Sequence, residues 1–208
     1  MARRSGSTVR SGLRRNEGLS GAGAAVPRGD AFVVATPHLR LIAAQLAHLR
    51  TELDDPTKLG ALLGAEVPAS WPPGEYDRGA IAYFLSQYER RGSAAVGWYG
   101  WYAIRPSSAQ DAARLVGAGG YFGPPDRDGT VEVGYSIADE WRGRGYATEV
   151  ARALTERALR EPRVRRVIAH AAADNAASHG VLLRAGFRRL DCGETGKRRY
   201  ERVAGPKA

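Results

Sequence analysis

Between residues 130 and 160 the spacing of the hydrophobic residues changes from every second residue to every third or fourth residue. The first part alternates, and this predicts a strand with one buried face made by Val131, Val133, Tyr135 and Ile137. From Tyr146 the apolar residues recur at helical spacing, on a stripe formed by Val150, Leu154 and Ala158. The chain must therefore fold as a strand, a short loop and a helix in direct succession.

The connecting loop, Arg142-Gly-Arg-Gly145, predicts a phosphate site. The first N–H groups of a helix lack partners within the helix and lie at the positive end of its dipole, and two arginines flank them here. Two common nucleotide patterns do not fit. A dinucleotide motif would need Gly or Ala where Thr148 stands, and a mononucleotide loop would need a Gly-Lys-Ser/Thr sequence.

Length and composition favour one folded domain with a basic tail. A chain of 208 residues that is 43% hydrophobic can bury one core, which we expect to be a single domain over residues 31–208. Residues 1–30 carry six arginines against two acidic residues and almost no large apolar side chain. We therefore expect residues 1–30 to be a disordered basic tail that contributes +4 of the net charge of +9.

Composition also excludes several classes of protein. No apolar run reaches the length of a membrane span, and the four histidines do not cluster, so neither a membrane protein nor a metal site is predicted. The lone Cys192 is consistent with a reducing compartment, and we expect a cytoplasmic protein. Nucleic-acid binding is disfavoured, because no segment interleaves basic residues with stacking aromatics.

The order of the predicted elements indicates an α+β (mixed α/β) fold. N-terminal helices precede strands at 95–104, 115–122 and 130–137, whose short connections predict an antiparallel meander. The strand predicted at 164–173 follows a helical crossover and should be parallel to its predecessor. A further helix and a last pair of strands complete a mostly antiparallel sheet flanked by helices.

Three motifs give the chain a family resemblance. Arg142, Gly145 and Ala147 fit the pattern Arg/Gln-x-x-Gly-x-Gly/Ala, and Asn175-Ala-Ala-Ser178 leads to Ala185-Gly-Phe187. A glycine-rich strand at 115–123 precedes the first motif. On these motifs the chain resembles the GNAT superfamily of acyl-CoA-dependent N-acyltransferases, over residues 36 to 203, and within it the branch of the Rim-type ribosomal-protein N-terminal acetyltransferases.

The resemblance implies acetyl-CoA as the acyl donor. Its pyrophosphate would lie on the loop, its pantetheine arm would pair with the strand edge where two strands splay apart, and the Asn175 side chain would contact the arm from the opposite wall. The residues expected to bind the cofactor are Ser136, Ile137, Arg142, Gly143, Arg144, Gly145, Tyr146, Ala147, Thr148 and Asn175.

Acyl transfer to an amine needs a base for the amine and a proton donor for the thiolate. Glu132 is the candidate base, because it shares a strand face with the small residues Gly134 and Ser136; a structural ion pair is the equal alternative. Many family members carry a tyrosine donor where Leu182 stands here. Ser178 is the candidate replacement, with Tyr135 or water as the other choices.

Two further residues are expected to contact the acceptor. Trp71 lies on a proline-rich loop that should be exposed, and it is the candidate wall of the acceptor site. His170 lies on the strand next to Glu132 and is expected to bind substrate or to act as the base, although a packed histidine is the more common outcome.

The functional expectation is an acetyl-CoA-dependent N-acetyltransferase that acts on a primary amine by direct transfer in a ternary complex. The acceptor, a protein N-terminus or a small amine, is left open, as is the choice between monomer and homodimer. The alternatives are a catalytically inactive acyl-CoA-binding regulator, which Leu182 favours, and, less favoured, a basic nucleic-acid-binding module.

Overall fold

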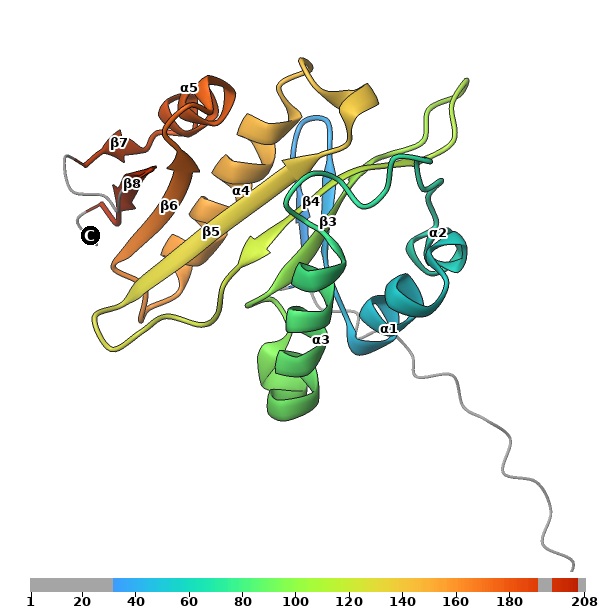
Figure 1. Cartoon of the computed structure of the whole chain (residues 1–208), viewed down its shortest axis with the longest axis horizontal. Helices are drawn as coiled ribbons and strands as arrows, with labels where there is room; N and C mark the ends of the chain where they lie inside the picture. Colours follow the sequence, from blue (N-terminus) through green and yellow to red (C-terminus); the bar gives the residue numbers. More distant parts are fainter. Residues whose placement is uncertain (1–31, 191–195, 206–208) are drawn as a thin grey trace, which may run out of the picture.

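A sheet of eight strands organises the computed structural model, which describes residues 32–190 and 196–205 (Figure 1). The strand order is β1-β2-β3-β4-β5-β6-β8-β7, and every neighbouring pair is antiparallel except β5 and β6. The strands are β1 (Val33–Ala35), β2 (Arg40–Ala43), β3 (Gly100–Arg105), β4 (Arg114–Tyr121), β5 (Thr130–Ile137), β6 (Arg166–Ala172), β7 (Arg188–Arg189) and β8 (Lys197–Val203). The predicted fold class and the parallel crossover are confirmed. The expected tail, residues 1–30, and Cys192 lie outside the described residues.

Helices cover both faces of the sheet (Figure 1). They are α1 (Leu46–Asp54), α2 (Leu59–Leu63), α3 (Arg78–Arg91), α4 (Tyr146–Arg160) and α5 (Ala176–Arg184). On one face, α4 packs so closely that a Cβ atom at Gly119 would lie 2.9 Å from Val150 and from Leu154. On the other face, Phe84 of α3 would lie 3.2 Å from a Cβ at Gly100. Small residues in the strands therefore let both helices approach the sheet.

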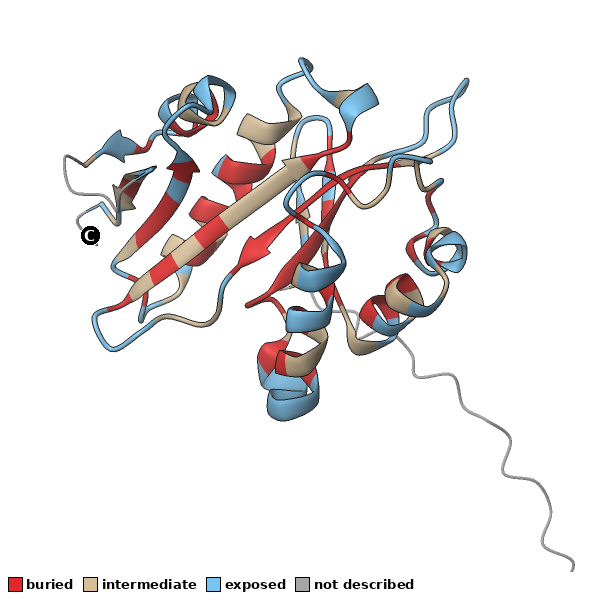
Figure 2. Ribbon diagram, in the orientation of Figure 1, coloured by how far each residue is buried: buried red, intermediate tan, exposed pale blue. Residues whose placement is uncertain are grey.

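The core lies on both sides of the central strands (Figure 2). The alternation predicted for β5 is confirmed for Val131, Val133 and Ile137, which are buried. Tyr135, expected on the same buried face, is only partly buried, as are Glu132 and Ser136 on the other face. On α4, the predicted stripe of Val150, Leu154 and Ala158 is fully buried against the sheet. The period change in the sequence thus marks the true junction of a strand and a helix.

The strand predicted over residues 95–104 is too long. Residues Gly92–Ala95 form a 3-10 turn, Gly97 takes a left-handed φ of 81°, and β3 begins only at Gly100. Trp98 packs against Tyr121, with ring centroids 5.5 Å apart. The guanidinium carbon of Arg157 lies 5.1 Å from the centroid of the Trp98 ring. The composition of this aromatic segment favours a strand, but these tertiary contacts hold the segment in a turn.

The two parallel strands separate soon after they meet. β5 and β6 pair only at Thr130–Arg166, Val131–Val167 and Glu132–Ile168. Beyond these positions β5 stays paired with β4 as far as Ile137, and β6 stays paired with β8. A fork therefore opens between the C-terminal halves of β5 and β6, as the family resemblance implied.

A buried carboxylate ties the proline-rich loop to the core. Glu52 on α1 is 2% exposed, and it accepts hydrogen bonds from Trp71 Nε1 at 2.7 Å, from the Tyr76 hydroxyl at 3.0 Å and from the Tyr102 hydroxyl at 2.6 Å. Burial raises the pKa of Glu52, and the three hydrogen bonds partly oppose that shift. Trp71, expected on an exposed loop, is instead half-buried in this network.

Replacing Glu52 with alanine should lower the free energy of unfolding by about 3 kcal/mol or more. Three buried donors would lose their acceptor, and each unsatisfied buried group costs roughly 1–3 kcal/mol. Urea unfolding followed by tryptophan fluorescence measures the change. Glu52→Gln is the matched control, because it keeps the shape and an acceptor for Trp71, and it should retain most of the stability. An equal loss in both variants would contradict the role assigned to the hydrogen bonds.

The Glu52→Gln variant also tests the direction of the pKa shift. Because the folded-state pKa of Glu52 is raised, its contribution to stability is fully present below the unfolded-state pKa and is lost as the pH rises through the folded value. Urea unfolding between pH 4 and pH 8 should therefore show Glu52→Gln gaining stability relative to the wild type as the pH rises. A difference that does not change with pH would contradict the shift.

Candidate functional site

A cavity of about 630 Å³ lies where the fork opens, at the C-terminal end of β5. Its walls come from both faces of the sheet. Gly74 and Glu75 line it from the side of the proline-rich loop, while Val181 and Arg184 of α5 line it from the side of α4. The cavity therefore passes through the sheet where β5 and β6 are no longer paired.

The loop before α4 presents unpaired N–H groups to this cavity. Gly143 and Gly145 have left-handed φ values of 75° and 82°, and a Cβ atom at either position would meet open space. Gly145 caps α4 without a side-chain hydrogen bond. Within residues 32–190 and 196–205, the backbone N–H groups from Gly143 to Thr148 have no hydrogen-bond partner. Open donors at a helix N-terminus form a site for an anion.

The side chains of the loop are braced by their neighbours. Arg142 lies 2.8 Å from the carboxylate of Asp139, and its Nε donates to the Ile137 carbonyl at 3.3 Å. Arg144 stacks on the ring of Trp141, with its guanidinium carbon 5.0 Å from the centroid. Every residue that the sequence predicted for cofactor binding lines the cavity except Arg144.

The start of α5 forms the opposite wall. The Asn175 carboxamide oxygen accepts from the Ser178 backbone N–H at 3.0 Å and so caps the helix. Its amide nitrogen makes no hydrogen bond among the described residues. Asn175 and Ser178 both line the cavity, across from the loop. One side chain can thus cap the helix and also offer donors to a bound molecule.

Sequence reasoning missed several residues of the cavity. Val181 and Arg184 follow Ala177 at helical spacing, so extending the α5 stripe would have found them. Gly74 and Glu75 carry no such signal, since Trp71 and Tyr76, bound to Glu52 on either side of them, bring this segment to the cavity.

Glu132 and His170 meet beside the fork. Their Oε1 and Nδ1 atoms are 2.8 Å apart, and the side chains are 32% and 27% exposed. Glu132 shares its strand face with Gly134 and with Ser136, which lines the cavity. Ser136 is four residues from Glu132, or roughly 13 Å along the strand. The structure brings the two predicted residues together, although neither lines the cavity, and Trp71 does not line it either, since its indole donates to Glu52.

Leu182 does not face the cavity, because it is 1% exposed and packs in the core. Two hydroxyl groups lie nearby instead, on Ser178 and Tyr135, and both residues line the cavity. The Tyr135 hydroxyl is buried without a hydrogen-bond partner in the described part of the chain. Burial raises the pKa of Tyr135 to about 12, and the neighbouring Ser178 side chain opposes that shift.

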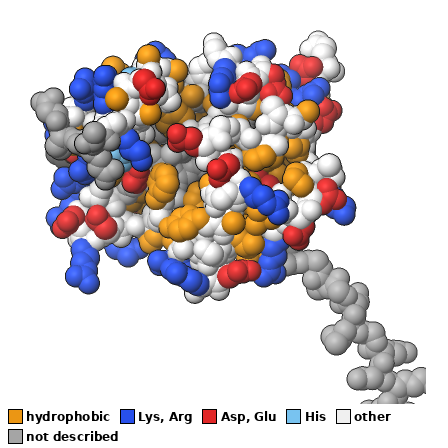
Figure 3. Space-filling model, viewed as in Figure 1, with side chains coloured by type: hydrophobic (Ala, Val, Ile, Leu, Met, Phe, Trp, Pro, Cys, Tyr) orange, Lys and Arg blue, Asp and Glu red, His pale blue; other side chains and the backbone are white. Residues whose placement is uncertain are grey.

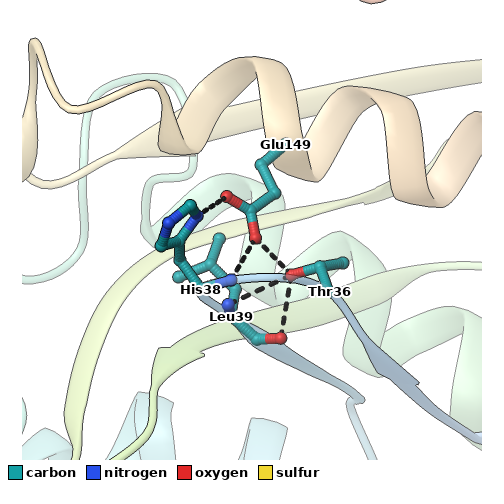
Figure 4. Close-up of polar contacts among 4 residues, drawn as sticks. All are labelled: Thr36, His38, Leu39 and Glu149. Atoms are coloured by element: carbon teal, nitrogen blue, oxygen red, sulfur yellow. Dashed lines mark hydrogen bonds and ion pairs between the residues drawn. The ribbon is translucent and has the colours of Figure 1, made fainter.

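Glu149, in the first turn of α4, holds that turn against the connection between β1 and β2 (Figure 4). Its carboxylate contacts the Thr36 hydroxyl, accepts from the His38 backbone N–H at 2.8 Å and lies 3.1 Å from His38 Nδ1. Burial alone would raise the pKa of Glu149, but the contacts with Thr36 and His38 outweigh it, and the pKa is lowered.

Two absences concern only the described ranges, 32–190 and 196–205. They contain no group of three or more His, Cys, Asp or Glu side chains placed to hold a metal ion. They also contain no helix that is both long enough and apolar enough to span a membrane.

Comparison with known proteins identifies relatives. The family model described as "Acetyltransferase (GNAT) domain" matches residues 46–188. An uncharacterized N-acetyltransferase of Bacillus subtilis (strain 168), YjdG, is 30% identical over 125 residues, which are 60% of this chain and 71% of that protein.

Solved structures share the fold. A RimL ribosomal L7/L12 alpha-N-protein acetyltransferase in complex with coenzyme A matches with a TM-score of 0.57 and 18% identity, over 82% of this chain and 97% of that one. The microcin C7 self immunity acetyltransferase MccE, in complex with acetyl-CoA and AMP, matches with a TM-score of 0.53 and 16% identity, over 81% and 93%.

Replacing Glu149 with glutamine should lower the free energy of unfolding by about 1–2 kcal/mol at pH 7, because its hydrogen bonds are charge-assisted. Its folded-state pKa is lowered, so this contribution is present above the ordinary value of 4.5 and is lost as the pH falls through the folded value. Urea unfolding at several pH values should show the two proteins converge in acid. Glu156→Gln on the same helix, whose partner Arg202 is 3.7 Å away, is the control and should change little. A pH-independent difference for Glu149 would contradict this account.

Proposed function

The chain belongs to the GNAT family of acetyltransferases, and from that premise we propose that it transfers an acetyl group from acetyl-CoA to a primary amine. The transfer is direct, within a ternary complex, and the acceptor is a protein N-terminus or a small amine. The cavity through the fork carries this proposal, because it joins an anion-binding loop to a sheet face that bears a carboxylate.

The loop is suited to bind the pyrophosphate of acetyl-CoA, and the fork is suited to bind its pantetheine arm. The free N–H groups of residues 143–148, with Arg142, are suited to hold the pyrophosphate. The edge of β5 at Ser136 and Ile137, which has no strand beside it in the fork, can pair with the amides of the pantetheine arm. Asn175 supplies amide donors from the other wall, and Arg184 adds a cation. Bound coenzyme A and acetyl-CoA in the two structural relatives support this assignment.

The acyl transfer needs two proton movements. Glu132 accepts the proton of the amine, directly or through a water molecule, while His170 holds its carboxylate in place. The nitrogen of the neutral amine gives up this proton as it bonds to the thioester carbon, and the carbon–sulfur bond breaks. The thiolate leaves with a proton from a hydroxyl group, for which Ser178 is the candidate and Tyr135 its neighbour on the cavity wall. The proton that Glu132 gains replaces the one that the hydroxyl group loses, by exchange with solvent, so a neutral amine gives an amide and a free thiol without net proton release. An acceptor that binds as an ammonium ion first releases one proton to solvent.

A non-catalytic acyl-CoA-binding regulator is the second candidate. The observation that favours it is the burial of Leu182, which leaves no tyrosine donor at that position of α5. Measured acetyl transfer distinguishes the enzyme from the non-catalytic regulator. An assay of free thiol released from acetyl-CoA over a panel of amines and peptides should show acetylation, and binding of acetyl-CoA without any turnover would favour the regulator.

Arg142→Ala should weaken acetyl-CoA binding about tenfold or more in calorimetry, because one charge-assisted contact to phosphate is lost. Arg160→Ala is the matched control, since Arg160 is an exposed arginine in the last turn of α4, at the far end of the helix from the loop. An unchanged dissociation constant for Arg142→Ala would argue against the loop as the pyrophosphate site.

Glu132→Gln should lower kcat strongly and flatten its rise with pH, while the KM for acetyl-CoA stays near that of the wild type. The pH profile of kcat measures this, because an amide cannot accept the proton. The His170→Gln variant shows which of the two residues, Glu132 or His170, is the base. If that variant loses the pH dependence and Glu132→Gln keeps it, His170 is the base and the assignment of Glu132 is wrong.

A further inference from the structure

Two aromatic side chains are exposed on the sheet face that carries Glu132. Phe122, which follows β4, is 56% exposed, and Tyr83 on α3 is 45% exposed. Figure 3 shows apolar side chains gathered on this side of the molecule between β5 and α3. Adjacent exposed apolar side chains can mark an interaction site, whereas a single exposed apolar residue is common on any protein surface.

Both rings are held in place although they face solvent. The Phe122 backbone N–H donates to the Glu132 carbonyl at 3.1 Å, and the Tyr83 hydroxyl contacts the Phe122 carbonyl at 3.4 Å. The Tyr83 ring also packs against Phe84 and Tyr99, at centroid distances of 5.9 and 6.3 Å. The exposed pair therefore has a fixed geometry, as a binding surface requires.

Phe122 lies between the candidate base and the cavity. A Cβ atom at Gly134 would be 3.3 Å from the edge of the Phe122 ring. Gly134 is the residue of β5 that separates Glu132 from Ser136 on their shared face. A molecule that places its nitrogen near Glu132 and receives an acetyl group from the cavity must therefore lie beside this ring.

We infer that Phe122 and Tyr83 determine acceptor specificity, and that the acceptor is a primary amine whose neighbouring carbon bears an apolar group that packs on the two rings. This inference rests on the proposed function and names the class of its substrate. An ammonium group complements the Glu132 carboxylate, and an apolar group beside it gains by covering the exposed rings.

The net charge of the protein favours an acceptor that carries an apolar group over an acceptor that carries a second positive charge. A cation can also bind the face of an aromatic ring, but the chain carries a net charge of +9, which repels polycationic acceptors. On β6, the residue opposite Glu132 is Ile168, which is also apolar. The acceptor is thus an amine with one positive charge and an aliphatic or aromatic substituent.

The test compares kcat/KM for acetylation of glycinamide, serinamide, leucinamide, phenylalaninamide and lysinamide. Leucinamide and phenylalaninamide should exceed glycinamide about tenfold or more, as expected for an apolar side chain that leaves water. Phe122→Ala should reduce this preference to less than about threefold while the KM for acetyl-CoA is unchanged. Phe122→Leu should retain most of it. Leu183→Ala, which removes a 55% exposed side chain from α5, is the control and should change nothing.

Calorimetric binding of the same amides to the protein saturated with coenzyme A separates the inference from the proposed function. If no amide is acetylated but leucinamide binds more tightly than glycinamide in a Phe122-dependent way, the inference stands and the catalytic proposal fails. Acetylation with equal kcat/KM for glycinamide and leucinamide overturns the inference alone. A preference for lysinamide that depends on Phe122, or neither turnover nor selective binding, also overturns it.

Discussion

The parallel pairing of β5 with β6 stops after three residue pairs, and the cavity beside Ser136 and Ile137 depends on that limit. β6 remains fully engaged with β8 over seven pairs, so its direction is set by the C-terminal half of the sheet. β5 remains engaged with β4, so its direction is set by the meander. The edge of β5 that faces the fork keeps backbone groups without strand partners, and a ligand in the fork could pair with them.

A second constraint acts from the opposite face. Glu52 is a buried carboxylate whose oxygens are satisfied by Trp71, Tyr76 and Tyr102 rather than by a cation. Such a group contributes little to stability through its charge, because its transfer from water is unfavourable. Its contribution is geometric, since it connects α1, β3 and the proline-rich loop at one point. The loop residues that line the cavity lie between two of its hydrogen-bond donors.

Local periodicity was enough to predict β5, the glycine loop, α4 and the start of α5, because in these segments the neighbours in sequence decide the structure. The place of Asn175 opposite the loop followed from the family resemblance rather than from periodicity. Periodicity failed for Trp98 and Tyr99, which have the composition of a strand but are held by Tyr121, Arg157 and α3. It also failed for Gly74, Glu75 and Phe122, whose positions depend on contacts with residues far away in the sequence. The proposed donor-binding loop was therefore predictable from the sequence, whereas the proposed acceptor side was not.

The contacts of Glu149 with Thr36 and His38 have a consequence for ligand affinity. They join residues more than 110 positions apart, and they fix the first turn of α4 in the free protein. A loop that is already ordered loses less conformational entropy when a ligand binds, so more of the interaction energy is available for affinity. The connection between β1 and β2 thus orders the start of α4 from outside the cavity. Under the proposed function, part of the affinity for acetyl-CoA would reside in a turn more than 100 residues before the loop.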